Sequence, residues 1–456
     1  MLKSLHLRKV GPSDELKLEL MPRLNLITGD NGLGKSFLLD IAWWAMTRRW
    51  PQSLNKSLVS GYVARPQSAK EGRIEFVVKG KTGKDVRYAS TFSPRDEAWT
   101  GKAGRPHNPG LVLYAMADGG FAVWDPARNY WKKVGDEDVQ DRVPAYVFSP
   151  IEVWDGLKDP KRGQLCNGLL SDWAGWQKEG GEPFRQLCSV LAKLSESEAQ
   201  PLEPGPLTRI SLDDARDMPT LKTAYGKAVP VLHASSGVRR IIALAYLLVW
   251  SWQEHIKAAE LIEEDTTPQV VFLIDEIEAH LHPRWQRAIV SALLDVTEAL
   301  AGAAQVQLIV ATHSPLVMAS AEPRFDAQQD AWFDLDLMPS TAKKEASVQL
   351  TQREFERLGD VSRWLVSDAF DLERPSSHEA EVLVTQAETM VQDKKATAAQ
   401  AEELTRRLEG VLGPVDPFWP RWRMAGAKRG WWPPVSPAPV LQADGQKVKA
   451  RKDGAA

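Results

Sequence analysis

Gly29-Asp30-Asn31-Gly32-Leu33-Gly34-Lys35-Ser36 directly follows a strand-like apolar run at residues 24–28 and leads into a helical pattern. The octapeptide fits GxxxxGK[ST], in which glycines let backbone N–H groups close around phosphate oxygens, the lysine reaches the outer phosphates and the hydroxyl can hold Mg²⁺. The positive end of the following helix adds to the attraction. A Gly-rich turn between strand and helix is the alternative. The stretch predicts a nucleoside triphosphate site formed by Gly29, Asp30, Asn31, Gly32, Gly34, Lys35, Ser36 and Phe37.

The composition is that of a globular protein. The chain has 456 residues, of which 43% are hydrophobic, enough for one large domain with insertions or for two ordinary domains. Only Cys166 and Cys188 are present, which argues against a disulfide framework and a cysteine-based zinc site. Residues 1–6 lack the apolar segment of a signal peptide, and the longest apolar run, 241–250, is too short to span a bilayer. We expect a cytoplasmic protein without membrane contact.

Positive charge is concentrated near the C-terminus. The whole chain has a formal charge of −3, which gives nucleic acid no general attraction. From Arg421 onward, eight Lys and Arg stand against two Asp, a surplus of 8 − 2 = +6. Because Pro and Gly are also dense there, residues 426–456 are expected to form a basic, disordered tail. A tail that is only solvated and a local nucleic-acid patch both stay open.

Apolar patterns indicate an α/β fold with a mixed sheet. Runs at 270–274 and 306–310 predict buried parallel strands separated by a helix at 284–301, and residues 241–252 predict a buried helix. Two outlying regions accompany this core. Hairpin patterns at 72–92 and 111–124, after a strand at 16–20, predict an antiparallel β lobe within 72–135. Helical spacing between 151 and 200, with Leu157 and Leu165 among its apolar positions, predicts a helical arm inserted at 151–230.

Two carboxylates end the apolar run at 270–274. Beside a phosphate loop, Mg²⁺ needs a hard oxygen ligand at a neighbouring strand end, which Asp275 can supply. Glu276 can then orient or deprotonate the water that attacks the terminal phosphorus. The alternative is ordinary surface charge at the end of a strand.

Polar residues also follow the next predicted strand and precede the buried helix. His313, in the sequence Ala311-Thr312-His313-Ser314-Pro315, could hydrogen-bond the terminal phosphate and report its presence. A strand-end histidine without a ligand is the alternative. Ser235, Ser236 and Gly237 at a helix N-terminus predict a second phosphate-facing surface, although a plain helix cap explains the serines equally well.

In this order, the four motifs resemble those of ABC-type ATPases, in the soluble branch that includes RecF-like and overcoming-lysogenization-defect-type proteins. The resemblance covers about residues 1–340 and implies an ATPase with MgATP as its nucleotide. Family members pair head to tail, which implies a homodimer or a larger homo-oligomer held together by nucleotide. Each site would join Lys35, Ser36, Asp275, Glu276 and His313 of one subunit to Ser235, Ser236 and Gly237 of another.

The sequence around these motifs adds two details to the resemblance. Residues 275–283 look like the strand end and subunit-contact loop of that branch, which places His280 and His282 at a dimer seam; a metal pair is the alternative. ABC proteins usually carry a glutamine after the strand that leads into the helical arm. Ser149 occupies that place here, so a second Mg²⁺ contact is left unassigned.

The C-terminal third carries a second and less specific resemblance. Apolar positions at Leu383, Ala387 and Met390, continuing through residues 404–411, predict a long helix before Asp416-Pro417-Phe418-Trp419-Pro420-Arg421-Trp422. This resembles the C-terminal part of ATPases from Septu and retron anti-phage systems, which act with a separately encoded HNH nuclease. Residues 341–425 are therefore expected to form a helical, partner-binding region. The nearby Asp334-Leu335-Asp336 is read as strand surface, so the chain is expected to carry no nuclease site.

The leading hypothesis is a slow ATPase that assembles with nucleotide and controls an HNH-type nuclease effector in phage defence. The alternative is a RecF-like repair ATPase that clamps DNA. A transporter motor and a scaffold with structural ATP complete the set. The trigger, the partner and its stoichiometry, the hydrolysis rate, and the binding of retron DNA, retron RNA or invading DNA do not follow from the sequence.

Overall fold

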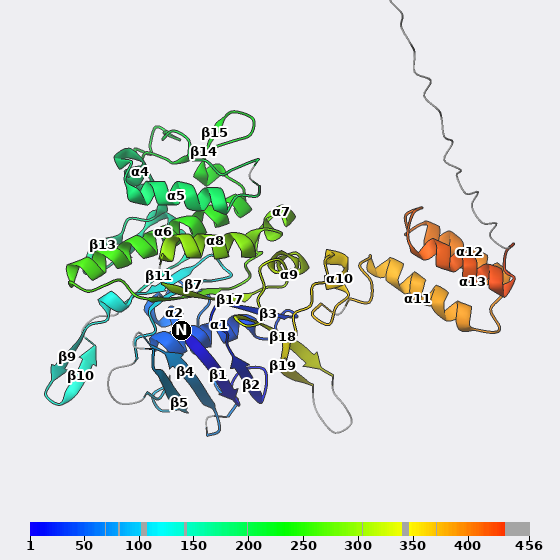
Figure 1. Cartoon of the computed structure of the whole chain (residues 1–456), viewed down its shortest axis with the longest axis horizontal. Coiled ribbons are helices and arrows are strands. Elements are labelled where there is room, and N and C mark those ends of the chain that lie inside the picture. The colour runs from blue at the N-terminus through cyan, green and yellow to red at the C-terminus, as the bar shows by residue number, and fades with distance from the viewer. Residues whose placement is uncertain are drawn as a thin grey trace, which may run out of the picture. The chain divides into compact units, whose positions relative to one another are not determined.

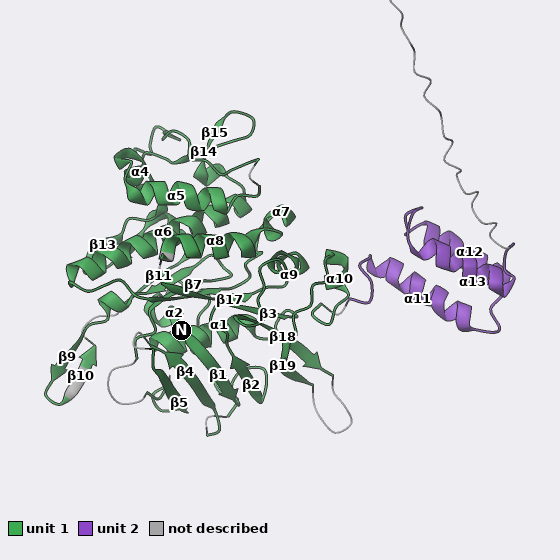
Figure 2. Ribbon diagram, in the orientation of Figure 1, with its two compact units in different colours: residues 1–371 green, residues 372–456 purple. Residues whose placement is uncertain are grey.

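The computed structural model describes residues 1–68, 70–80, 83–101, 107–140, 144–197, 199–302, 304–339, 346–370 and 372–433. The chain divides into two compact units, residues 1–371 and 372–456 (Figure 2). Among the described residues, all strands belong to the first unit, and the second unit consists of three helices (Figure 1). No helix within these ranges is both long and apolar enough to cross a membrane.

The larger sheet of the first unit has eight strands in the order β11-β8-β7-β16-β17-β3-β18-β19. The neighbouring strands from β7 to β18 in this order run parallel, whereas β11, β8 and β19 pair antiparallel at the two edges. This confirms the predicted mixed sheet and brings the carboxyl ends of the parallel strands to one edge. The strands are β3 (Leu24–Gly29), β7 (Leu111–Ala115), β8 (Phe121–Trp124), β11 (Ala145–Phe148), β16 (Gln269–Ile274), β17 (Gln305–Ala311), β18 (Asp330–Met338) and β19 (Ser347–Arg353).

Both faces of the sheet are covered, which explains why its central strands are continuously apolar. Alternate residues of β16 point to opposite sides: Phe272 packs with α6 and α8, whereas Leu273 packs with α1. The predicted strands at 270–274 and 306–310 and the buried helix at 241–252 are confirmed. The predicted helix at 284–301 is wrong in one respect, because it is interrupted at 287–288. The helices are α1 (Lys35–Thr47), α6 (Ser236–Leu261), α7 (Pro283–Gln286), α8 (Ile289–Ala301) and α9 (Pro315–Ala321).

A second, antiparallel sheet with the order β2-β1-β4-β5-β6 packs with α1. The hairpin at 72–92 is confirmed as β4 and β5, although Lys81 and Thr82 lie outside the described residues. The hairpin at 111–124 also forms, but as β7 and β8 it belongs to the large sheet, so the predicted lobe at 72–135 is wrong in extent. The strands are β1 (Leu2–Arg8), β2 (Glu15–Glu19), β4 (Arg73–Lys79), β5 (Asp85–Ser93) and β6 (Ala98–Trp99), with a separate hairpin of β9 (Trp131–Val134) and β10 (Glu137–Gln140).

The predicted arm at 151–230 contains helices and two hairpins. Leu157 and Leu165, which fit helical spacing, lie instead in the hairpin β12/β13. Gly156 and Gly168 flank this hairpin with positive φ angles of 92° and 82°, a conformation that ends a helix and that glycine adopts without strain. The elements are α3 (Pro150–Asp155), β12 (Leu157–Asp159), β13 (Gly163–Cys166), α4 (Leu169–Glu179), α5 (Glu182–Lys193), β14 (Thr220–Lys222) and β15 (Ala228–Pro230). Short helical segments elsewhere are α2 (Pro51–Leu54), η1 (Pro126–Arg128), η2 (Val231–His233) and α10 (Val361–Leu365).

The C-terminal boundaries differ from those expected. Strand β19 completes the large sheet, so the first unit extends past residue 340 to residue 371. The predicted long helix is broken between α11 (His378–Gln392) and α12 (Ala398–Glu409), because Thr397 and Gln400 form a capping box that starts a new helix. A third helix, α13 (Phe418–Arg429), extends into the predicted tail, of which residues 434–456 lie outside the described part. The three helices share a core of Leu383, Val384, Ala387, Ala401, Leu404, Leu408, Phe418, Trp419 and Trp422.

Candidate functional site

The phosphate loop joins β3 to α1 at the carboxyl edge of the parallel strands. Gly29, Gly32 and Gly34 have φ angles of 129°, 82° and 102°, which side chains rarely tolerate. A Cβ on Gly29 would also lie 2.3 Å from the carbonyl oxygen of Leu335 on β18. The ring of Phe37 packs against Gly11, so this residue can offer a ligand only its backbone N–H. The three glycines are therefore required by the backbone conformation and by the close approach of β18, as the phosphate-loop pattern predicts.

The ammonium group of Lys35 spans this loop. Its side chain is buried, and Nζ donates to the carbonyl oxygens of Gly29 at 2.6 Å and Asp30 at 2.9 Å. Burial lowers the pKa of Lys35 to about 8, although nearby carboxylates, Asp275 first among them, oppose the shift. The lysine is thus held beside the loop in a form that is charged at neutral pH.

Asp275 lies at the end of β16, where the sequence predicts a metal ligand. Its side chain is 3% exposed, and Oδ1 has no hydrogen-bond partner among the described residues. Burial raises the pKa of Asp275 to about 6, and a hydrogen bond with Ser36 opposes the rise. A buried carboxylate oxygen without a partner is costly unless a cation pairs with it. Asp275 and Ser36 together fit the hard oxygen ligands that Mg²⁺ prefers.

Glu276 and His313 meet at the same edge from the ends of β16 and β17. Glu276 Oε1 lies 4.0 Å from His313 Nε2, and Glu276 has a φ angle of 45°, which is unusual for a residue with a side chain. Burial lowers the pKa of His313, and the charge of Lys35 lowers it further. The histidine is therefore neutral at pH 7, when one ring nitrogen can donate a hydrogen bond and the other can accept one.

Glu278 is a site residue that the sequence analysis missed. Its Oε2 accepts a hydrogen bond of 2.7 Å from the Thr312 hydroxyl, and its Oε1 accepts one from the backbone N–H of His313. Glu278 therefore ties the turn that carries Glu276 to the turn that carries His313. Its partners lie 34 and 35 positions along the chain, so no local pattern could have identified it.

The serines at the start of α6 have different environments. Ser235 caps the helix by accepting a hydrogen bond from the Val238 N–H, as the alternative interpretation proposed. Ser236 is exposed, and its hydroxyl bonds to no other described residue. A Cβ on Gly237 would lie 2.6 Å from the carbonyl oxygen of His280 in the same chain, so Gly237 serves close packing. Of the three residues, Ser236 has a side chain free to contact a ligand.

Arg240 joins the start of α6 to the nucleotide edge, which the sequence also did not reveal. Its guanidinium donates to the carbonyl oxygens of Ala117 at 3.1 Å, Met116 at 3.2 Å and Asp275 at 3.3 Å. These contacts hold the turn after β7, the end of β16 and α6 together. His280 and His282 belong to no group of three or more metal-ligating side chains among the described residues. The His282 ring nitrogen Nδ1 instead accepts a hydrogen bond from the backbone N–H of Arg284.

Ser149 does not occupy the position next to the candidate metal site that the sequence analysis assigned to it. Ser149 caps α3 in a capping box with Glu152, and its strand β11 lies at the edge of the sheet, two strands away from β7. The strand beside β16 is β7, and the Asp275 N–H donates to the carbonyl oxygen of its last residue, Ala115. The turn that adjoins Asp275, the candidate metal ligand, is therefore 116–120, which contains Asp118 and no glutamine.

The interpretation of Asp334 as strand surface is wrong. Its side chain is fully buried, and it accepts a hydrogen bond of 2.7 Å from the Thr28 hydroxyl, one residue before the phosphate loop. Arg353 on β19 bonds to both Asp334 and Asp336, which offsets part of their negative charge. Burial nevertheless raises the pKa of Asp334 to about 6. The pattern failed because β18 is an inner strand between β3 and β19, and Asp334 bonds to a side chain of each neighbour, Thr28 and Arg353.

A phosphate loop, a strand-end Asp-Glu pair and a strand-end histidine on neighbouring parallel strands define a nucleotide-binding domain of the ABC-type ATPase class. The family model described as "AAA domain, putative AbiEii toxin, Type IV TA system" matches residues 24–319. This is more than half of the chain, which therefore belongs to that family.

Two curated relatives resemble shorter segments. A stretch of 162 residues, or 35% of this chain, is 27% identical to 26% of the "Retron Ec83 probable ATPase" of Escherichia coli. A stretch of 110 residues, or 24% of the chain, is 31% identical to 19% of the "Retron Vc95 probable ATPase" of Vibrio cholerae serotype O1 biovar El Tor. The matches thus span about a quarter or less of these relatives' lengths.

Among solved structures, the SMC head domain from Thermotoga maritima aligns over 77% of this chain and 98% of its own, with 13% identity and a TM-score of 0.36. An SMC head bound to the C-winged helix domain of ScpA covers the same shares, with 14% identity and a TM-score of 0.39.

Replacing Glu278 by Ala should slow ATP hydrolysis about tenfold to a hundredfold while leaving the KM for ATP nearly unchanged, because the turns of Glu276 and His313 would lose their common anchor. Steady-state phosphate release over a range of ATP concentrations measures both constants. Glu260→Ala, at an exposed position on α6, is the matched control. A rise in KM with unchanged kcat would show that Glu278 contributes to binding instead.

Nucleotide affinity should fall as the pH rises above about 8, since the lowered pKa of Lys35 means that the free protein loses its loop charge there. Loss of the Lys35 charge should change the affinity by no more than about twofold between pH 7 and pH 8. Above pH 8 it should decrease the affinity by up to about tenfold per pH unit. Titration with a fluorescent, nonhydrolysable ATP analogue measures this. A Lys35→Arg variant, which stays charged, should bind more weakly but without this pH dependence; equal pH profiles would contradict the assignment.

Proposed function

We propose that this chain binds and hydrolyses MgATP and that two copies close head to tail around the nucleotide. The observation that carries the first part is the buried, unpartnered carboxylate oxygen of Asp275 beside Ser36 and the phosphate loop. Ordinary folding leaves few such atoms. Its position, at the strand end next to the loop, is where a nucleotide-bound cation would compensate it.

Different side chains of the site would bind phosphate, hold Mg²⁺ and activate water. Lys35 exchanges its two backbone carbonyl partners for oxygens of the outer phosphates. Ser36 and Asp275 would hold Mg²⁺, which would neutralise phosphate charge when bound. Glu276, 43% exposed at its side chain, takes a proton from the attacking water, and neutral His313 donates a hydrogen bond to the terminal phosphate. Glu278 positions both residues.

The head-to-tail arrangement rests on the start of α6. Ser236 is exposed at a helix N-terminus, where free N–H groups and the helix dipole favour an anion. Among the described residues, no hydrogen bond joins Ser235 or Ser236 to the phosphate loop of the same chain. In the proposed arrangement, Ser236 contacts a phosphate held by the loop of a second copy, and nucleotide would hold the two copies together.

The finer part of the proposal is control of a separate nuclease effector of HNH type in anti-phage defence. Two curated relatives carry the name retron ATPase, and the described chain adds to the ATPase unit a small helical unit suited to holding a partner. The Asp334-Leu335-Asp336 motif is committed to the phosphate loop and Arg353, so it offers no nuclease site. We propose that the nuclease effector is a separate chain.

In a Glu276→Gln variant, phosphate release should fall by about a hundredfold or more, and ATP should convert monomers into dimers that persist. Light scattering with and without ATP measures the association. Adding Ser236→Arg should abolish the dimer without abolishing ATP binding, because the exposed position 236 contacts only the second copy. Dimers that survive Ser236→Arg would contradict the head-to-tail arrangement.

A mixing experiment provides the control for that result. Lys35→Ala and Ser236→Arg chains should each be inactive alone, yet an equal mixture should recover at most about half of the normal rate, since each mixed dimer contains one intact composite site and one in which both halves are disabled. A mixture as inactive as its components would mean that each chain builds its site alone.

Purification of the chain expressed with its neighbouring genes should yield a co-purifying HNH protein whose nuclease activity changes with Glu276→Gln. Mass spectrometry of the purified sample and DNA cleavage assays test this. Isolation of the chain by itself, with salt-sensitive and ATP-strengthened binding to duplex DNA, would instead favour a RecF-like repair ATPase.

A further inference from the structure

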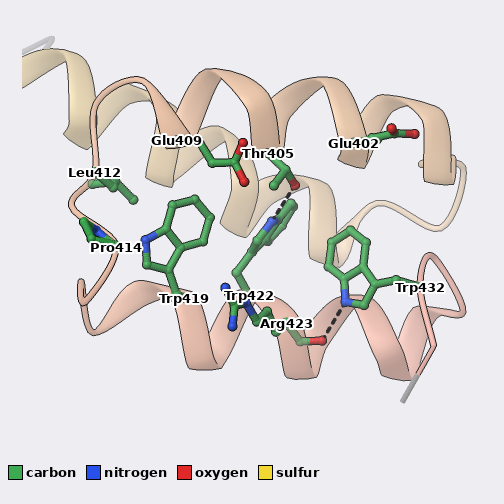
Figure 3. Close-up of a pocket in the computed structure, with 9 residues that line it drawn as sticks. All are labelled: Glu402, Thr405, Glu409, Leu412, Pro414, Trp419, Trp422, Arg423 and Trp432. Carbon is green, nitrogen blue, oxygen red and sulfur yellow. Dashed lines mark hydrogen bonds between the residues drawn. The ribbon is translucent and has the colours of Figure 1, made fainter. Parts of the chain in front are cut away.

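The second unit has a groove that its own helices leave open. It lies between α12 and α13, has a volume of about 590 Å³ and is lined by aromatic side chains with a few charged ones (Figure 3). We call it the indole groove and define it by Trp419, Trp422, Trp432, Glu402, Glu409 and Arg423. All of these residues belong to one compact unit, so the groove does not depend on how the two units are placed.

The indole rings present carbon rather than donors to the groove. Each ring nitrogen already donates within the unit: Trp419 to the Gly413 carbonyl, Trp422 to the Thr405 hydroxyl and Trp432 to the Arg423 carbonyl. Two of these bonds are drawn in Figure 3. Fixed indoles with satisfied N–H groups offer flat apolar surface without a polar requirement. Proline rings in an extended polyproline II segment stack on such surfaces at low entropic cost.

Acidic side chains lie along one wall of the groove. Glu402 and Glu409 are seven residues apart on α12, hence on the same side of the helix and about 10 Å apart along its axis. Neither forms an ion pair with a described residue, whereas Glu403 on the same helix pairs with Arg406. Among the described residues that line the groove, Arg423 is the only cationic one, so their charge is −2 + 1 = −1. The wall suits a basic ligand.

The chain itself contains a segment of matching chemistry, and it starts where the groove is. Pro434, Pro437 and Pro439 follow Trp432 closely. Pro434 and Pro437 are three positions apart, which is one turn of polyproline II. Lys447, Lys449, Arg451 and Lys452 come next, opposed up to that point only by Asp444. Because the segment is tethered at the groove, its effective concentration there is on the order of millimolar.

We propose that residues 434–452 occupy the indole groove of their own chain. The prolines pack on the indoles, and the basic residues pair with Glu402 and Glu409. A second copy of the chain or a separate protein could use the same chemistry, and the experiment below distinguishes these occupants. The proposal does not depend on the ATPase function.

The test uses the chain ending at Pro433 and a fluorescein-labelled synthetic peptide of residues 434–453. Fluorescence anisotropy should show that the peptide binds the shortened chain at low ionic strength and binds the full-length chain at least about tenfold more weakly, because the tethered segment already fills the groove. In the shortened chain, Glu402→Gln with Glu409→Gln should weaken binding by about tenfold or more, whereas Glu403→Gln should not. Circular dichroism checks that each variant is folded.

Other results would overturn the proposal. Absence of binding to the shortened chain, or binding insensitive to Glu402→Gln with Glu409→Gln, would remove the groove as the site. Equal peptide affinity for the full-length and shortened chains would show that the segment does not occupy its own groove. If the full-length chain is a dimer by light scattering and the chain ending at Pro433 is a monomer, the occupant is the segment of a second copy. A peptide with Pro434, Pro437 and Pro439 replaced by Ala should bind more weakly; unchanged affinity would eliminate the polyproline contact.

Discussion

Burial of opposite charges at the carboxyl edge of the parallel strands is the constraint on which this site depends. Lys35 and Asp275 are 4% and 3% exposed. Burial lowers the pKa of Lys35 and raises the pKa of Asp275, so it favours the neutral form of each group. Two carbonyl oxygens hold the lysine, but one oxygen of Asp275 has no partner. A bound polyphosphate with its cation would compensate both groups at once, because the anion faces the lysine and the cation faces the carboxylate. The fold thus fixes charges in advance of the ligand that needs them.

Two carboxylates support this edge through contacts with residues that are distant in the chain. Glu278 holds the turns of Glu276 and His313 together, and Asp334 supports Thr28 from behind the phosphate loop. Carboxylates withdrawn from water, Asp334 fully and Glu278 in part, are stabilised when their oxygens find a donor or a charge. Glu278 accepts two hydrogen bonds, and Asp334 faces both a hydroxyl and a guanidinium. Both residues bond to backbone or side-chain groups beside the loop and the strand ends, so they can act by orienting the candidate site residues.

Features of the fold and the site could be predicted where they depend on a short stretch of sequence, and not where they depend on partners distant in the chain. The phosphate loop, the buried strands at 270–274 and 306–310, and Asp275 are determined by short stretches whose spacing has a direct meaning. Sheet membership is not local: β7 and β8 read as a hairpin in sequence, yet only pairing with β16 shows that they belong to the large sheet. Leu157 and Leu165 kept helical spacing while glycines on either side enforced a hairpin. Glu278 and Arg240 could not be found, because their partners are distant in the chain.

One turn links the two halves of the proposed composite site. Residues 276–280 begin and end with positive φ angles, 45° at Glu276 and 63° at His280, which are strained for residues with side chains. The His280 carbonyl packs on Gly237, and Arg240 binds the carbonyl oxygen of Asp275, so α6 is fixed to both ends of the turn. The turn cannot relax around Glu276 without displacing the start of α6, and Ser236 with it. A change at one nucleotide would therefore reach the surface offered to the other copy through a single short segment.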